Sequence, residues 1–221
     1  MKKQFIVIGL GQFGISLTRT LIQNKHEVLA IDKNIKMVER VADIATHAIQ
    51  ADCTDEEVLE EIGVNNFNHA IVSVGEDLEA SILITLLLKE RGVPQVTAKA
   101  NTTIHGRMLE KIGADHIVYP ERDMGIRLGK QLSSENLIDY IELSPDHNLV
   151  EMKAPPAMNG RSLKDLNIRA NYGCNIIAIK HGEEINMSPM ADDIIQTGDV
   201  LLLMGNNNDI RRMEDKYDRT R

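Results

Sequence analysis

Three glycines near the start of the chain have the spacing of a phosphate-binding loop. They form the pattern G-x-G-x-x-G, which follows an apolar run at 5–8 and precedes a helical pattern at 15–22. In a dinucleotide-binding fold the first glycine allows a tight turn, the second lets backbone approach a pyrophosphate, and the third lets the helix pack closely on the strand. Because amides at a helix start attract an anion, the pattern predicts a phosphate site; the alternative is a glycine-rich turn without a ligand. The predicted contact residues are Gly9, Gly11, Gln12, Phe13 and Gly14.

Polar residues also follow the next two predicted strands. Asp32 comes about 20 residues after the loop, the separation at which the dinucleotide fingerprint places a carboxylate against both ribose hydroxyls. A carboxylate at this position repels a 2′-phosphate, which favours ATP, ADP or NAD(H) over NADP(H). The alternative is that Asp32 only forms a turn before Asn34. Topology alone places Asp52 and Cys53, at the end of the third strand, on the adenine side of the site.

The elements that must position these residues are short apolar runs that alternate with helical patterns. The predicted strands lie at 5–8, 28–31, 47–51, 70–74, 96–100 and 117–119. The runs are nearly continuous in apolar residues, as expected for strands covered by helices on both faces. Six β-α units in a row predict an α/β fold with a Rossmann-like, doubly wound parallel sheet. Thr54 with Glu57 predicts a capping box, and Pro120 predicts the first position of a helix.

After about residue 134 the pattern changes to short strands and tight turns with little helix. The predicted strands lie at 137–143, 149–153, 175–180, 185–188 and 200–204, with a hairpin turn at 181–183. We therefore expect a nucleotide-binding domain at 1–134, and a connection with a small α+β regulatory domain at 135–221. The highly charged segment 206–221 predicts a solvated helix that frays.

Composition excludes several classes of protein. The net charge of −8 and the lack of a Lys/Arg-rich run argue against a nucleic-acid partner. The longest apolar stretch, 80–88, is far shorter than the roughly 20 residues of a membrane-spanning helix. The N-terminus lacks the features of a signal peptide, so a cytoplasmic location is expected. Cys53 and Cys174 lie in different predicted domains, which argues against a disulfide framework and favours small buried hydrophobic roles.

The sequence contains no recognisable catalytic set. None of the four tyrosines has a lysine four residues later, and the seven histidines show no metal-ligand spacing. A nucleotide fold does not by itself imply nucleotide chemistry. We therefore expect a protein that binds without turnover, not an enzyme, and keep an NAD-dependent oxidoreductase as the alternative.

Several segments together resemble a known family. Residues 5–14, 111–117 and 120–124 resemble the KtrA-type cytosolic regulators of Ktr/Trk potassium uptake, and residues 168–180 resemble the carboxy-terminal module of the same regulators. The resemblance covers nearly the whole chain. It implies an N-terminal and a C-terminal RCK domain (regulator of conductance of potassium). It also implies a homo-octameric ring, a tetramer of dimers, bound at the inner face of the membrane to a KtrB-type potassium-translocating subunit.

The resemblance assigns roles to residues of the first domain. It implies that ATP and ADP bind the glycine loop with opposite effects on transport, that NAD(H) can occupy the same site, and that Lys99 lines it. Glu121 would help to hold a divalent cation, Mg²⁺ or Ca²⁺, beside the triphosphate; the alternative is a carboxylate that stabilises a helix N-terminus. Family members commonly carry arginine where this chain has Gln12, so discrimination between ATP and ADP is expected to be weaker or to use another cation.

In related regulators the C-terminal dimer interface binds cyclic di-AMP, which lowers uptake. The resemblance suggests polar contacts and an apolar floor for adenine; the alternative is that the isoleucines form the core and dimer contact of the small domain. Strand alternation prevents Ile176 and Ile177 from facing the same side. The residues implied for this site are Ile168, Arg169, Ala170, Asn175, Ile176, Ile177, His181 and Pro189.

The segment 80–88 is apolar nearly all round its predicted helix. A helix that covers a sheet needs only one apolar face. We therefore expect its other face to contact a neighbouring subunit.

Overall fold

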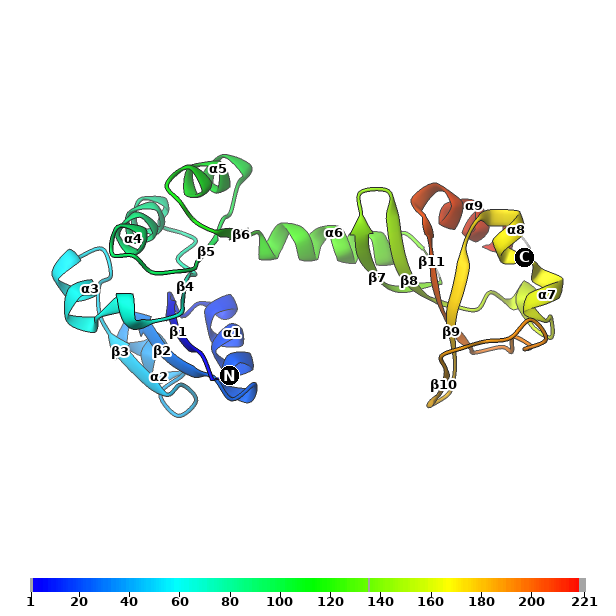
Figure 1. Cartoon of the computed structure of the whole chain (residues 1–221), viewed down its shortest axis with the longest axis horizontal. Helices are drawn as coiled ribbons and strands as arrows, with labels where there is room; N and C mark the ends of the chain where they lie inside the picture. Colours follow the sequence, from blue (N-terminus) through cyan, green and yellow to red (C-terminus); the bar gives the residue numbers. More distant parts are fainter. Residues whose placement is uncertain (1, 135, 219–221) are drawn as a thin grey trace. The chain divides into compact units, whose positions relative to one another are not determined.

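The computed structural model describes residues 2–134 and 136–218 and divides the chain into two compact units, Met1–Asp123 and Met124–Arg221 (Figure 1). The division falls inside one helix. Each unit has its own sheet and its own core, so each is described separately.

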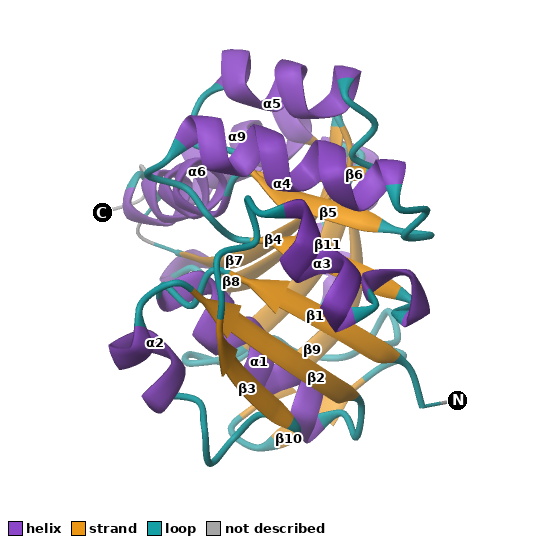
Figure 2. Cartoon of the chain, turned by 90° about the vertical axis from the view of Figure 1, so that its left-hand side faces the viewer, coloured by secondary structure: helices purple, strands orange, loops and turns teal. Residues whose placement is uncertain are grey.

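The first unit is a six-stranded parallel sheet with the strand order β3-β2-β1-β4-β5-β6, seen in Figure 2. This order confirms the predicted Rossmann-like, doubly wound sheet, and each predicted strand overlaps an observed one. The strands are β1 (Gln4–Ile8), β2 (Glu27–Asp32), β3 (His47–Gln50), β4 (His69–Val72), β5 (Val96–Lys99) and β6 (His116–Val118). The helices are α1 (Gln12–Gln23), α2 (Ile35–Glu39), α3 (Glu56–Ile62), the 3-10 turn η1 (Val64–Asn66), α4 (Leu78–Glu90) and α5 (Thr103–Lys111). The helix that contains the division between the units is α6 (Pro120–Leu132).

Both faces of the sheet are buried. On β1, Ile6 and Ile8 pack on the side of α3, α4 and α5, whereas Val7 packs on the side of α1 and α2. Alternate residues of one strand therefore enter two cores, which explains why the runs are apolar without alternation. Figure 2 shows the strands between their helices.

The second unit contains a five-stranded antiparallel sheet with the order β10-β9-β11-β8-β7. The predicted hairpin is confirmed, because Gly182 has φ +58° between two antiparallel strands. The strands are β7 (Leu137–Ser144), β8 (His147–Lys153), β9 (Asn175–His181), β10 (Glu184–Asn186) and β11 (Val200–Asn206). The helices are the 3-10 turn η2 (Pro156–Met158), α7 (Leu163–Leu166), α8 (Ile168–Tyr172) and α9 (Asn207–Asp218).

Two local predictions were wrong. The helix α9 is not merely solvated, because Ile210 and Met213 are buried at 5% and 1% exposure and belong to the core of the second unit. The cap of α3 is Asp55, whose side chain accepts from the Glu57 amide at 3.0 Å, and not Thr54. Asp55 directly precedes the helix, and aspartate is preferred over threonine at the N-cap position.

The two cysteines are buried, as predicted, at 2% exposure for Cys53 and 0% for Cys174. Burial raises the pKa of the Cys53 thiol to about 12 and that of Cys174 to about 11. Neither thiol forms a disulfide. Both therefore act as small apolar core residues, since a neutral thiol is a weak nucleophile and a poor metal ligand.

Candidate nucleotide-binding site

The glycine loop connects β1 to α1, and two of its glycines are required by the fold. Gly9 has φ +95° and donates its amide to the Ile31 carbonyl at 2.8 Å. A Cβ on Gly14 would lie 2.1 Å from the Gly9 carbonyl oxygen, so only glycine lets α1 approach this closely. At Gly11, by contrast, a Cβ would meet nothing within 4 Å. The second glycine thus leaves open space above the loop, as a ligand would need.

The start of α1 also lacks a side-chain cap among the described residues. Its N-cap Gly11 has no capping side chain, and no acidic residue lies in the first turn. The helices α3, α4 and α5 are capped by the side chains of Asp55, Asp77 and Thr102. A helix start without a side-chain cap leaves amides that favour an anion from outside.

Asp32 ends β2 beside the loop. Its Oδ2 accepts the Leu10 amide at 2.7 Å, and its Oδ1 accepts the Asn34 amide at 2.8 Å. The contact with the Leu10 amide connects the glycine loop to β2. The contact with the Asn34 amide forms the turn that was the alternative role of Asp32. Each carboxylate oxygen can accept more than one hydrogen bond, so these contacts leave capacity for ribose hydroxyls.

Asp52 and Cys53, the two residues expected near adenine, lie in different environments. Asp52 is exposed, and hydrogen bonds from the Thr54 amide at 3.0 Å and the Thr54 hydroxyl at 2.7 Å hold its pKa below the usual value. The Cys53 side chain lies in the core cluster under the sheet. Any contact of Cys53 with a ligand would therefore involve its backbone.

Lys99 and Glu121 form an ion pair at the same edge of the sheet. The Lys99 Nζ lies 2.6 Å from the Glu121 Oε1, with the lysine side chain 14% exposed and the glutamate 67% exposed. The hydrogen bond from Lys99 lowers the pKa of Glu121. Glu121 also lies in the first turn of α6, so both interpretations of this residue stay open. In the part of the chain that the structure describes, no group of three or more His, Cys, Asp or Glu side chains could hold a metal.

Sequence reasoning considered Lys33 only as a neighbour of Asp32 and missed the other residues at this edge. Ser73, just after β4, is 7% exposed, and its Oγ is buried without a hydrogen-bond partner among the described residues. The side-chain Nδ2 of Asn101, after β5, donates to the Gly75 carbonyl. Lys33 reaches Asp77 at 3.8 Å, and because β2 and β4 flank β1, this pair spans the end of the central strand. The available signal was position, since all of them follow strand ends.

The residues expected to bind cyclic di-AMP lie on α8, on β9 and after β10. Ile168 is 4% exposed and belongs to the core, and Ile176 packs against the same core. Both residues therefore contact the core, as the alternative expects, and their part in a ligand site stays a prediction. Ile177 lies where the pairing between β9 and β11 shifts and is not part of that cluster. Side chains do not alternate strictly at such a bulge, so the expectation that the two neighbours face opposite sides stays a prediction. Arg169 and Ala170 are exposed on α8.

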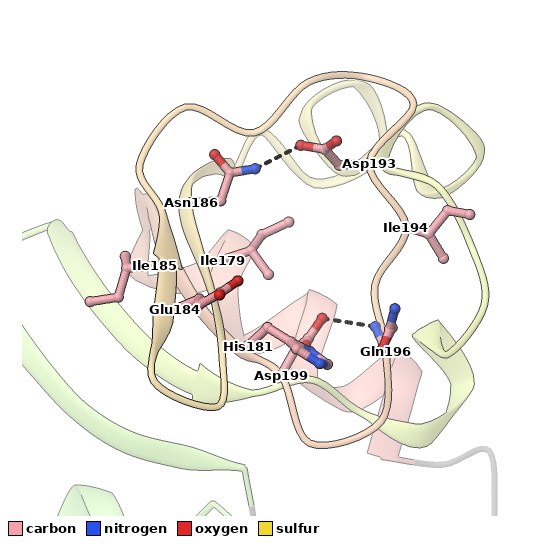
Figure 3. Close-up of a pocket in the computed structure, with 9 residues that line it drawn as sticks. All are labelled: Ile179, His181, Glu184, Ile185, Asn186, Asp193, Ile194, Gln196 and Asp199. Atoms are coloured by element: carbon pink, nitrogen blue, oxygen red, sulfur yellow. Dashed lines mark hydrogen bonds and ion pairs between the residues drawn. The ribbon is translucent and has the colours of Figure 1, made fainter.

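A pocket of about 310 Å³ lies beside His181 (Figure 3). Three of the lining residues are acidic, Glu184, Asp193 and Asp199, and none of the described lysines and arginines lines the pocket. The His181 Nδ1 lies 2.6 Å from the Asp199 Oδ1. Of the residues expected to bind cyclic di-AMP, only His181 lines this pocket. The full lining is Ile179, His181, Glu184, Ile185, Asn186, Asp193, Ile194, Gln196 and Asp199.

Two known domain families together cover most of the chain. Residues 5–120 match the TrkA-N domain and residues 149–217 match the TrkA-C domain. The crystal structure of the GsuK RCK domain has the same fold, with a TM-score of 0.69 and 17% identity over 98% of this chain and 48% of that chain. The GsuK channel bound to NAD superimposes with a TM-score of 0.66 and 18% identity, over 95% of this chain and 38% of that one.

Closer relatives define the family. The chain is 50% identical to Ktr system potassium uptake protein C of Bacillus subtilis (strain 168) over 97% of both chains. It is 47% identical to Ktr system potassium uptake protein A of the same organism, over 97% of this chain and 96% of that protein. This chain therefore belongs to the KtrA-type family of potassium uptake proteins, with a TrkA-N and a TrkA-C domain. Among the described residues no helix is both long and apolar enough to cross a bilayer.

Proposed function

We propose that this chain is the regulatory subunit of a potassium uptake system and gates it by binding ATP or ADP at the glycine loop, with NAD(H) as a further ligand of that site. The observation that carries the proposal is the uncapped start of α1 beside the open space at Gly11. Asp32 supports it, since its carboxylate already lies against the loop. The family supports regulation of transport over oxidoreductase chemistry.

Ligand-induced stabilisation tests this proposal. A ligand present at 100 times its Kd stabilises the folded state by about 2.7 kcal/mol, which raises the melting temperature by roughly 5 °C for a chain of this size. We expect ATP and ADP to produce this shift in differential scanning fluorimetry, and NADH to bind without being oxidised. Unchanged melting with saturating ATP, ADP and NADH would rule the proposal out, and steady consumption of NADH with a metabolite would favour an oxidoreductase.

We further propose that Glu121 holds a divalent cation, Mg²⁺ or Ca²⁺, beside the nucleotide phosphates. The ion pair between Lys99 and Glu121 supports this. If a cation coordinates the Glu121 carboxylate, the Lys99 ammonium loses this partner and becomes available for a phosphate. A Cβ on Gly75, just after β4, would lie 3.3 Å from the Lys99 Nζ, so the ammonium lies near the central strands. Lys99 is thus the positive group that can substitute for the arginine missing at Gln12.

Replacing Glu121 with glutamine tests the cation site. We expect the extra thermal stabilisation that Mg²⁺ or Ca²⁺ adds to ATP binding to disappear, because a neutral amide is a weaker ligand for a hard cation. ATP binding without the cation is expected to persist, because Lys99 is then free. Asp123→Asn is the matched control, since it removes a carboxylate from the same helix turn. Equal loss in both variants would mean that only the helix dipole matters.

We propose that the second domain binds cyclic di-AMP. The resemblance of residues 168–180 supports this, as does the exposed guanidinium of Arg169 on α8, which could contact a phosphodiester. Arg169→Gln is expected to weaken binding of cyclic di-AMP by about tenfold in calorimetry, whereas Lys164→Gln, a loss of charge on the neighbouring α7, leaves it unchanged. Equal affinities of Arg169→Gln and the wild type would remove Arg169 from the site.

We propose that the chain assembles with itself, as a tetramer of dimers, and acts at the inner face of the membrane through a KtrB-type translocating subunit. Exposed apolar side chains support self-association: Leu83 on α4 is 39% exposed, and Ile104 on the adjacent α5 is 59% exposed. Light scattering at micromolar concentration is expected to give a mass well above a monomer. Leu83→Glu is expected to lower that mass and Glu90→Gln is not; a monomeric wild type would contradict the proposal.

A further inference from the structure

Asp199, immediately before β11, is a buried carboxylate with two partners. Its side chain is 2% exposed. Its Oδ2 accepts the Gln196 amide at 2.8 Å, and its Oδ1 lies 2.6 Å from the Nδ1 of His181, which ends β9. Figure 3 shows both side chains at the pocket. The histidine side chain is 61% exposed, so this contact joins a buried anion to a surface ring.

The contact fixes which nitrogen of His181 carries a proton. A buried ionised carboxylate is costly unless it is paired, and it can only accept hydrogen bonds. The Nδ1 of His181 must therefore donate to Asp199. The second ring nitrogen, Nε2, is left for a ligand: it accepts when the ring is neutral and donates when the ring is charged.

The charged side chains around the His181 ring determine which protonation state of the ring favours binding of an anionic ligand. Glu184 on β10 lies directly opposite His181 in the strand pairing, and Asp193 lines the same pocket. Lys180 is the preceding residue on β9 and does not line the pocket. A phosphodiester that approaches His181 thus meets three carboxylates, and among the residues that line this pocket the charged ring is the group that offsets their repulsion.

We propose that Asp199 is a positioning residue of the cyclic di-AMP site, holding His181 through Nδ1 so that Nε2 faces the ligand. When a phosphodiester binds, Nε2 takes up a proton from solvent and donates it as a hydrogen bond to a phosphate oxygen, while Nδ1–H stays on Asp199. The inference rests on the proposed binding of cyclic di-AMP to the second domain.

The ligand-free protein gives the first test. Solid-state ¹⁵N NMR of full-length, histidine-labelled protein, with His181→Gln to assign the signal, reports which nitrogen is protonated in the neutral ring. We expect the Nδ1–H form in the wild type and a shift towards Nε2–H in Asp199→Asn. A wild-type ring protonated on Nε2 would overturn the inference whatever the ligand does.

Calorimetry with cyclic di-AMP, in two buffers that differ in heat of ionisation, gives the second test. We expect the wild type to take up protons on binding, and Asp199→Asn to bind on the order of tenfold more weakly with less uptake. Glu183→Gln is the matched control, because it removes an exposed charge from the adjoining turn without changing a residue of the pocket, and its proton uptake should persist. If Asp199→Asn does not fold, His181→Gln replaces it, with binding expected to lose proton uptake.

The outcomes separate the two proposals. No binding of cyclic di-AMP to the wild type would overturn the proposed function of this domain together with the inference. Binding without proton uptake would overturn the inference alone. Reduced thermal stability of Asp199→Asn, with unchanged affinity and unchanged protonation of His181, would mean that Asp199 only holds the turn with Gln196.

Discussion

Gly14→Ala is expected to destabilise the first domain by about 3 kcal/mol and to lower its melting temperature by roughly 10 °C. The added methyl would lie 2.1 Å from the Gly9 carbonyl oxygen and 3.2 Å from both the Gly9 carbonyl carbon and the Ser73 Oγ. Two of these three atoms belong to backbone, so α1 must move away from β1 to accommodate it. Urea unfolding followed by circular dichroism measures the change in the free energy of unfolding.

Gly11→Ala is the matched control for this prediction. Its methyl meets nothing within 4 Å, and Gly11 has φ −67°, which alanine adopts without strain. Stability is expected to change by less than about 1 kcal/mol. Affinity for ATP and ADP should nevertheless fall, because the methyl occupies the space where the phosphates approach the backbone. Full nucleotide affinity in Gly11→Ala would show that the phosphates lie elsewhere, and a stable Gly14→Ala would contradict the close packing of α1.

Asp32→Ala is expected to have the second large effect, a loss of affinity for ATP and ADP of about 100-fold. Two charge-assisted hydrogen bonds to the ribose are worth about 1.5 kcal/mol each, and 1.4 kcal/mol corresponds to a factor of ten. The same substitution also removes the acceptor of the Leu10 amide, so the glycine loop loses its link to β2. Calorimetry with ADP at a temperature where the variant is folded measures the affinity.

Two companion variants separate binding from folding at this position. Asp32→Asn keeps an oxygen for the Leu10 amide while removing the charge, so it should lose affinity with a smaller loss of stability. Asp43→Ala removes an exposed carboxylate outside the sheet edge, and it is expected to change neither the nucleotide affinity nor the stability. If Asp32→Asn bound ADP as tightly as the wild type, the carboxylate would have a structural role only.

The main features of the fold could be predicted because they depend on local patterns. The loop glycines 9 and 14 are explained by close backbone packing, and the apolar runs became strands buried on both faces. The amphipathic character of α9 was also readable, since Ile210, Met213 and Tyr217 have helical spacing, but the high charge of the segment masked it. A pattern with a fixed period is a property of the chain itself, so it needs no knowledge of distant contacts.

The environments of individual side chains were decided by tertiary structure. The family resemblance implied that Lys99 and Glu121 belong to the nucleotide site, but it could not show that they pair at 2.6 Å. Nothing in the sequence indicated the contact of His181 with Asp199. It also could not show that Ile168 lies in the core. The glycine loop, the two-domain order and the family segments follow from the sequence by itself. Burial, ion pairing and the protonated nitrogen of a histidine arise only when residues distant in sequence meet, because they depend on which groups exclude water from one another.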